Sequence, residues 1–314
     1  MLKIYSFMLA FLLCLSAEAQ LSVILNQQQC FPSIIPPGNY SGITWLGGNR
    51  FAVVSDKSPF DGFFIFDIRF NHDNGSISSI KNLGFRSSDI PDRDDEGIAW
   101  NTKRHTLFIS GESDNRIVEY DTLGTPTTFA IATPHVFRHL PDNQGLEALS
   151  YSARENKIYT CNETAPITIL GIDSTLSQYD SIHYEMDPPK YNNKKHSFYA
   201  HGIGTICSIG TDSLLVLERE AHVPPLKIGA KVSCKLFLFN LTNHKKELVC
   251  EWQTGLGLAD RSFANYEGMC LGPTLADGSR VLIMVADSQG QYAGVLRDWF
   301  KTAVIVKRHT TGNQ

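Results

Sequence analysis

The chain has 314 residues, of which 42% are apolar and 19% are charged, and its formal net charge is −4 at pH 7. This amount of apolar material excludes a disordered chain and a fibrous repeat, because it can fill one large core or two smaller ones. The near balance of acidic and basic residues, with no long basic run, disfavours a nucleic-acid-binding surface.

The first 19 residues predict a secretory signal peptide. Lys3 precedes an apolar stretch from Ile4 to Leu15, and Ala17 and Ala19 stand where cleavage requires small residues. The apolar stretch is too short to span a bilayer. We therefore expect an exported protein, periplasmic or secreted, with no transmembrane segment after cleavage. Residues 20–308 are expected to form one domain, and residues 309–314 a disordered tail.

Between residues 40 and 308, short β-rich runs alternate with turns rich in Gly, Asn and Asp, which predicts an all-β fold. One pattern occurs five times: a polar residue, a Gly or Ala and an apolar residue open a strand, a hairpin turn follows, and a second apolar strand ends in an acid. The five openings and closing acids are Ser41-Gly42-Ile43 with Asp56, Glu96-Gly97-Ile98 with Glu112, Glu147-Ala148-Leu149 with Glu163, His201-Gly202-Ile203 with Glu218, and Glu267-Gly268-Met269 with Asp287. Their starts lie 51 to 66 residues apart, a spacing typical of one four-stranded blade of a β-propeller.

The two ends of the chain suggest how such a ring closes. The last copy has only three strands, ending with Ala303 to Val306, whereas Leu21 to Leu25 is a β-rich run without a partner. Pairing the two would close the ring and remove an exposed edge. We count five blades; the alternative is a degenerate sixth blade between residues 219 and 266.

The hairpin pattern also predicts where the acids lie. The first strand of a blade lines the central channel and the second lies behind it, so the opening residue and the closing acid should share one face of the disc. In every copy the midpoint of these two positions falls on turn residues. We therefore expect eight candidate metal ligands at one mouth: Asp56, Glu96, Glu112, Glu147, Glu163, Glu218, Glu267 and Asp287.

These carboxylates would repel one another unless cations neutralise them. One source is internal, from Lys57, Arg116, Arg219 and His201, which lie in or next to the same positions. The other is a hard divalent cation, with Ca²⁺ preferred in an exported protein. The alternative is that the acids cap backbone N–H groups and hold blades together.

At these positions the sequence resembles the phytase-like propellers described by the esterase-like activity of phytase. The resemblance covers roughly residues 40 to 290 and rests on Ser41-Gly42-Ile43 with Ser55-Asp56-Lys57, Asp95-Glu96-Gly97-Ile98-Ala99, Gly145-Leu146-Glu147-Ala148-Leu149, Leu215-Val216-Leu217-Glu218-Arg219-Glu220, and Asn265-Tyr266-Glu267-Gly268-Met269 with Asp287-Ser288. It implies an exported propeller that hydrolyses a phosphoester or another ester with the help of Ca²⁺.

The chemistry expected from the residues is metal-assisted, because no G-x-S-x-G elbow, P-loop or H-E-x-x-H motif is present. Ca²⁺ held by Glu96, Glu147 and Glu267 would bind anionic oxygens and polarise a water, with another carboxylate as base. His201, which replaces an acid or Ser at the repeat position, is a further catalytic candidate. Lys57, Arg219 and Arg116 are the candidates for substrate binding.

Other functions stay open at this point. The alternatives are a non-catalytic propeller that binds a ligand or protein, and a Ca²⁺-dependent lactonase of the gluconolactonase kind. We expect a monomer acting on a small molecule.

Cys234 and Cys250 flank the turn Leu241-Thr242-Asn243-His244 symmetrically, which predicts that they face each other across a hairpin. The pair would form a disulfide or remain as two packed, reduced thiols.

Overall fold

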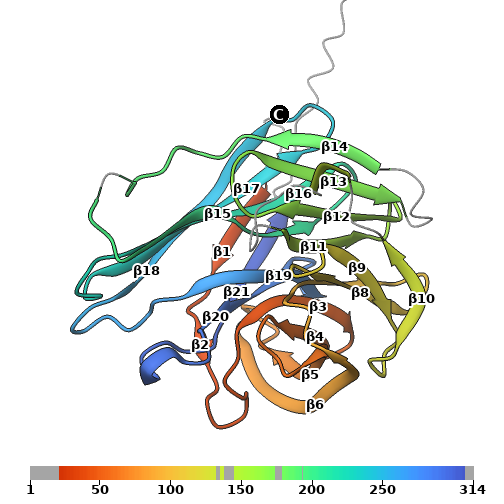
Figure 1. The fold of residues 1–314 in the computed structure, drawn as a ribbon, viewed down its shortest axis with the longest axis horizontal. Helices are drawn as coiled ribbons and strands as arrows, with labels where there is room; N and C mark the ends of the chain where they lie inside the picture. Colours follow the sequence, from red (N-terminus) through yellow and green to blue (C-terminus); the bar gives the residue numbers. More distant parts are fainter. Residues whose placement is uncertain (1–20, 132–134, 138–144, 174–178, 193, 308–314) are drawn as a thin grey trace, which may run out of the picture.

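The computed structural model describes residues 21–131, 135–137, 145–173, 179–192 and 194–307, so the expected signal peptide and tail lie outside the described residues. Their strands form five antiparallel sheets around a common centre, which confirms an all-β propeller of five blades (Figure 1). The helical elements among these residues are two short 3₁₀ turns, His135–Phe137 and Tyr292–Gly294. None of the helices described has the length and hydrophobicity needed to cross a membrane.

The first four blades each consist of four consecutive strands, ordered from the channel outwards. The first contains β3 (Tyr40–Gly47), β4 (Arg50–Ser55), β5 (Phe60–Phe70) and β6 (Ile77–Pro91). The second contains β7 (Asp95–Asn101), β8 (Thr106–Gly111), β9 (Arg116–Tyr120) and β10 (Pro126–Ile131). The third contains β11 (Leu146–Ser152), β12 (Lys157–Asn162), β13 (Ile167–Asp173) and β14 (Tyr179–Tyr184). The fourth contains β15 (Phe198–Ser208), β16 (Ser213–Val223), β17 (Ala230–Asn240) and β18 (Lys246–Leu256).

The fifth blade combines the two ends of the described chain. It contains β19 (Asn265–Thr274), β20 (Arg280–Asp287), β21 (Trp299–Lys307) and, outermost, β1 (Leu21–Leu25). β1 pairs antiparallel with β21, with Leu21 opposite Lys307 and Leu25 opposite Ala303. A short strand, β2 (Gln29–Cys30), pairs with the start of β21. Residues 219–266 complete the fourth blade and lead into the fifth, so they form no sixth blade.

The hydrophobic core is divided among the blade interfaces. Five clusters of buried apolar residues are present, and each joins residues of two neighbouring blades. The inner strands β3, β7, β11, β15 and β19 contact one another in a closed circle. Their close approach depends on small residues: a Cβ at Gly97 would lie 2.7 Å from the backbone nitrogen of Leu149. The packing of blade against blade therefore fixes the positions of the inner strands, which carry the candidate site.

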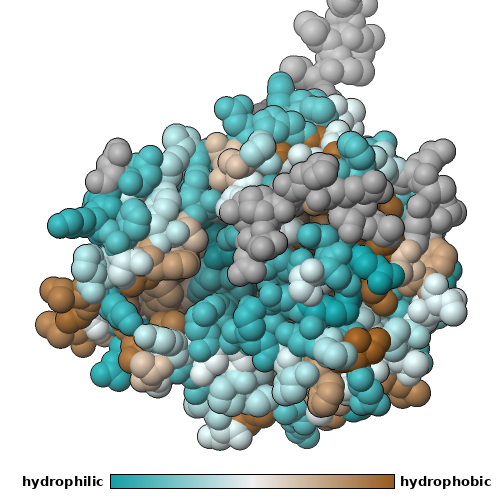
Figure 2. Space-filling model, viewed as in Figure 1, coloured by the Kyte–Doolittle hydropathy of each residue, from teal (hydrophilic) through white to brown (hydrophobic). Residues whose placement is uncertain are grey.

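The surface has contrasting regions. Figure 2 shows hydrophilic residues across the middle of the face in view and a hydrophobic patch at its left edge, where the long strands of the fourth blade end. The loops at these strand ends carry Leu226, Ile228 and Leu258, which are strongly exposed.

Candidate metal and active site at the channel mouth

A β-bulge interrupts every inner strand at one end. The pairing register shifts between Tyr40 and Gly42, and at the corresponding place in each of the other four blades. The additional residues at the five bulges are Ser41, Glu96, Glu147, Gly204 and Glu267. Because a bulge redirects a side chain and locally ends regular pairing, it turns these positions toward the channel mouth.

The second strand of each blade supplies the matching position. The residue that follows the bulge's pairing partner is Asp56, Glu112, Glu163, Arg219 or Asp287 in blades one to five. In the fourth blade Ile203 pairs with Glu218, so Gly204 and Arg219 occupy the positions predicted for His201 and Glu218. The predicted register of this blade was wrong because His201-Gly202-Ile203 resembles the repeat pattern, whereas the true bulge carries no side chain.

Arg219 is the main neutralising cation of the mouth. Its side chain is 6% exposed, and Nη2 lies 3.1 Å from Glu147, 3.0 Å from Glu163 and 3.2 Å from Glu267. Its Nη1 donates to Asn265 Oδ1 at 2.6 Å. The side chain passes beside Gly204, where a Cβ would lie 3.0 Å from Arg219 Cδ. The absence of a side chain at Gly204 therefore gives the guanidinium its place among three carboxylates.

Burial and mutual repulsion dominate the electrostatics of the remaining acids. Burial raises the pKa of Glu96 well above its usual range, and Glu147 and Glu267 raise it further. Burial also raises the pKa values of Glu147 and Glu267, and the nearby Arg219 opposes this rise only in part. The pKa of Asp56 rises to about 7, through burial first and then through Asp287. Ionising these carboxyl groups therefore costs folding free energy unless an additional cation is bound.

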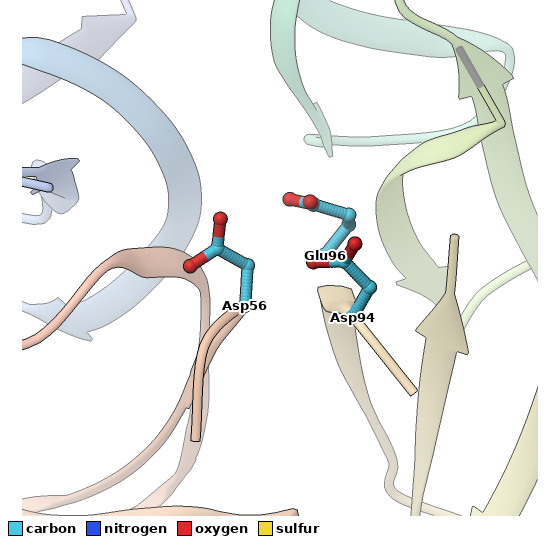
Figure 3. A group of neighbouring side chains, drawn as sticks. All are labelled: Asp56, Asp94 and Glu96. Atoms are coloured by element: carbon cyan, nitrogen blue, oxygen red, sulfur yellow. The ribbon is translucent and has the colours of Figure 1, made fainter. Parts of the chain in front are cut away.

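Three carboxylates converge at one side of the mouth, as Figure 3 shows. Asp56, Asp94 and Glu96 each offer an oxygen, and these oxygens all lie within 4.8 Å of one another. Oδ1 of Asp56 is buried and has no hydrogen-bond partner. Lys57 Nζ lies 2.5 Å from Asp94 and 3.8 Å from Asp56, while its side chain remains 58% exposed.

Asp94 was not identified from the sequence because it precedes the repeat pattern. It adopts a left-handed backbone conformation with φ of 60°, and its carbonyl oxygen accepts a hydrogen bond from the backbone N–H of Glu112 at 2.9 Å. This conformation turns it toward the mouth beside Glu96. The acidic run Asp92-Arg93-Asp94-Asp95-Glu96 was the available signal.

Two other predicted ligands serve structural contacts. Glu218 accepts hydrogen bonds from the Tyr184 hydroxyl at 2.8 Å and the backbone N–H of Asp187 at 3.0 Å, and it pairs with Lys246 at 2.7 Å. It therefore anchors the loop after β14, on the face of β16 opposite to Arg219. Asp287 remains at the mouth but also caps the backbone N–H of Gln289 at 2.6 Å.

His201 and Arg116 are not joined to the acids. His201 pairs with Glu220 in the β15–β16 ladder, three residues before the bulge, and lines a small recess with Glu220 and Lys235. Arg116 begins β9, the third strand of its blade, and is exposed. Neither side chain contacts a mouth carboxylate in the described part of the chain.

Residues 35–289 match the family model named Phytase-like, described as "Esterase-like activity of phytase". The chain belongs to the Phytase-like family. No curated protein matches it.

Solved structures show only distant likeness to this Phytase-like propeller. The tail fibre of Staphylococcus aureus phage P68 is 12% identical with a TM-score of 0.47; the match covers 92% of this chain, which spans only 53% of the fibre chain. A streptogramin B lyase is 13% identical with a TM-score of 0.40, over 91% of this chain and 98% of the lyase. A protein of unknown function from Bacteroides thetaiotaomicron is 12% identical with a TM-score of 0.44, over 91% and 76% of the two chains. Likenesses at this level carry no argument about function.

The structure of this Phytase-like propeller does not contain the predicted disulfide between Cys234 and Cys250. Cys234 and Cys250 are free thiols, and the register pairs Cys234 with Trp252 and Cys250 with Leu236. The hairpin turn places Phe239 opposite Lys246, one residue away from the predicted register, and a bulge between Leu236 and Phe237 adds a second residue of shift, so the two cysteines are not opposite each other. The alternative of two reduced thiols is therefore the one observed.

Proposed function

We propose that the channel mouth binds Ca²⁺ and hydrolyses a phosphoester or another ester. The observation that supports this is the excess of negative charge: eight carboxylates gather at the mouth, and Arg219 and Lys57 are the cations paired with them among the described residues. The eight are Asp56, Asp94, Glu96, Glu112, Glu147, Glu163, Glu267 and Asp287. A buried cluster of carboxylates must either take up protons or bind further positive charge, and a bound cation would let these acids stay ionised.

The donor set suits Ca²⁺. All donors are carboxylate oxygens, which hard cations prefer, and Ca²⁺ binds six to eight oxygens at roughly 2.3–2.6 Å. Two such ligands on opposite sides of an ion lie about 5 Å apart, which agrees with the 4.8 Å limit of the Asp56, Asp94 and Glu96 oxygens. The unpartnered Oδ1 of Asp56 is available as a ligand. Asp56, Asp94 and Glu96 would thus hold one ion.

When bound, Ca²⁺ supplies a Lewis acid for an anionic or carbonyl oxygen and lowers the pKa of a bound water. The protein's own groups have separate roles. Exposed Lys57 stands beside the cluster and would pair with an anionic part of the substrate. Arg219 is buried and uses its Nη donors on carboxylates and Asn265, so we assign it the positioning of Glu147, Glu163 and Glu267 rather than substrate binding.

Export is the second part of this proposal and rests on the sequence of residues 1–19 alone. An exported protein meets Ca²⁺ outside the cytoplasm, which is consistent with a calcium site.

The activity test is a substrate panel with Ca²⁺ or with EDTA. We expect p-nitrophenyl phosphate or p-nitrophenyl acetate to be hydrolysed with Ca²⁺, and the rate to fall at least 100-fold in EDTA and in Glu96→Gln. The control is Glu247→Gln, an exposed acid on β18, which should keep the parent rate. Turnover of gluconolactone alone would identify a lactonase, and no turnover across the panel would contradict hydrolysis and favour a binding propeller.

A further inference from the structure

A cleft lies away from the mouth, between the outer strand of the fourth blade and the fifth blade. Its volume is about 490 Å³, within the usual range for a small-molecule site. The residues that determine its chemistry are Gln27, Trp252, Arg261, Arg297, Trp299 and Lys301. Trp252 and Gln253 belong to β18, and Trp299 and Lys301 belong to β21. None of the mouth carboxylates lines this cleft.

The basic side chains that line the cleft are not paired with carboxylates in the described part of the chain. Lys301 is 8% exposed, and its Nζ donates to the backbone oxygen of Asn26 at 2.8 Å. Throughout the described ranges, Lys301, Arg261 and Arg297 form no ion pair with a carboxylate, and the cleft contains one acid, Asp260. Burial lowers the pKa of Lys301, which means that its charged form bears a desolvation cost. An anion in the cleft would offset this cost.

Two indole rings form the apolar part of the wall. Lys301 Nζ lies 5.7 Å from the ring centre of Trp252, and the Arg297 guanidinium lies 5.8 Å from that of Trp299. The indole N–H groups of both tryptophans are buried without a hydrogen-bond partner, although buried indoles usually have one. Internal hydrogen bonding therefore does not explain why the two tryptophans are placed here.

The remaining wall is polar and favours a ring that bears hydroxyl groups. Gln27 and Ser262 also line the cleft and carry an amide and a hydroxyl group. Ser262 Oγ accepts a hydrogen bond from the backbone N–H of Gly255 at 3.1 Å, which leaves its own hydroxyl proton to donate. A purely aromatic anion would leave such groups unpaired, at a cost in binding free energy.

We propose that this cleft binds a sugar acid, a pyranose ring that carries a carboxylate. The carboxylate pairs with Lys301 and Arg297, the C–H face of the ring packs against the indoles, and the hydroxyls bond to Gln27 and Ser262. The site is separate from the mouth, so it would serve substrate or surface recognition whether or not the mouth is catalytic.

Isothermal titration calorimetry of the full-length protein with glucuronate at pH 7 tests the proposal. We expect one site, with glucose, benzoate and inorganic phosphate each binding at least tenfold more weakly. Arg297→Gln removes an exposed charge and should weaken glucuronate binding at least tenfold, as should Lys301→Met if that variant folds. The control Lys81→Gln changes an exposed lysine of the first blade and should bind as the parent does.

Several results would overturn the proposal. These are no detectable binding of glucuronate, equal binding of glucose, benzoate or phosphate, or unchanged binding in Arg297→Gln. The measurement needs no hydrolysis, and Glu96→Gln should leave it unchanged, so its failure is distinct from failure of the proposed activity at the mouth.

Discussion

Replacing Arg219 by methionine tests whether its charge holds the mouth together. The side chain is 6% exposed and lies 3.0–3.2 Å from three carboxylates, so the variant keeps most of the packing but leaves the acids without their shared cation. Removing one partner of a buried ion pair costs about 3–5 kcal/mol. We expect this loss in the free energy of unfolding at pH 7 in EDTA, with a fall in Tm of roughly 10 °C.

The dependence on pH separates charge from packing. Burial raises the pKa values of Glu147 and Glu267, so these groups take up protons readily as the pH falls, and the loss in Arg219→Met should shrink at pH 5. The assay is urea or thermal unfolding at pH 5 and pH 7. Arg69→Gln is the matched control, because Arg69 pairs with Asp67 at 3.3 Å but is 58% exposed, and its loss should stay below about 1 kcal/mol. A loss in Arg219→Met that is equally small, or that is the same at both pH values, would show that the Arg219 charge does not stabilise the mouth.

Three further predictions concern the same region. Gly204→Ala places a Cβ 2.4 Å from the Tyr266 carbonyl oxygen, so we expect a loss of about 1–3 kcal/mol in urea unfolding, whereas Gly210→Ala, which meets nothing within 4 Å, should match the parent. Glu218→Gln should lower Tm because it weakens the contacts to Tyr184 and Lys246, yet keep the Ca²⁺-induced rise in Tm; loss of that rise would return Glu218 to the metal ligands. Asp56 has a folded-state pKa of about 7 against an ordinary 3.8, so its contribution to stability is fully present below about pH 4 and is lost as the pH rises through 7. In EDTA, the parent should therefore lose about 1.4 kcal/mol per pH unit across this window relative to Asp56→Asn, and parallel profiles of the two proteins would contradict the assigned pKa.

The repeat pattern was sufficient to predict the fold because four of the five blades use the same local chemistry at the bulge. A polar residue followed by a small one marks the bulge of the inner strand, and turn residues fix the length of the hairpin. This placed Glu96, Glu147 and Glu267, together with four closing acids, at one mouth without any knowledge of the structure. The β-rich run at Leu21–Leu25 likewise indicated the strand that pairs with β21.

The features that the sequence did not reveal depend on contacts between distant segments. In the fourth blade the bulge residue is Gly204, which has no side chain to mark it as part of the site. Its role is to leave space for the Arg219 side chain. Asp94 joins the site through a left-handed backbone conformation in a loop, which no periodic pattern encodes. The predicted pairing of Cys234 with Cys250 was wrong because the turn and one bulge each shifted the β17–β18 register by one residue.

The proposed divalent cation at the mouth can be located in an anomalous difference map from a crystal grown with Tb³⁺ as a Ca²⁺ substitute. We expect a strong peak within about 2.3–2.6 Å of oxygens from Asp56, Asp94 and Glu96, displaced by excess Ca²⁺ and absent in Glu96→Gln. A map without a peak at the mouth, or a peak that is confined to other acids and remains in Glu96→Gln, would contradict a cation site formed by these three residues.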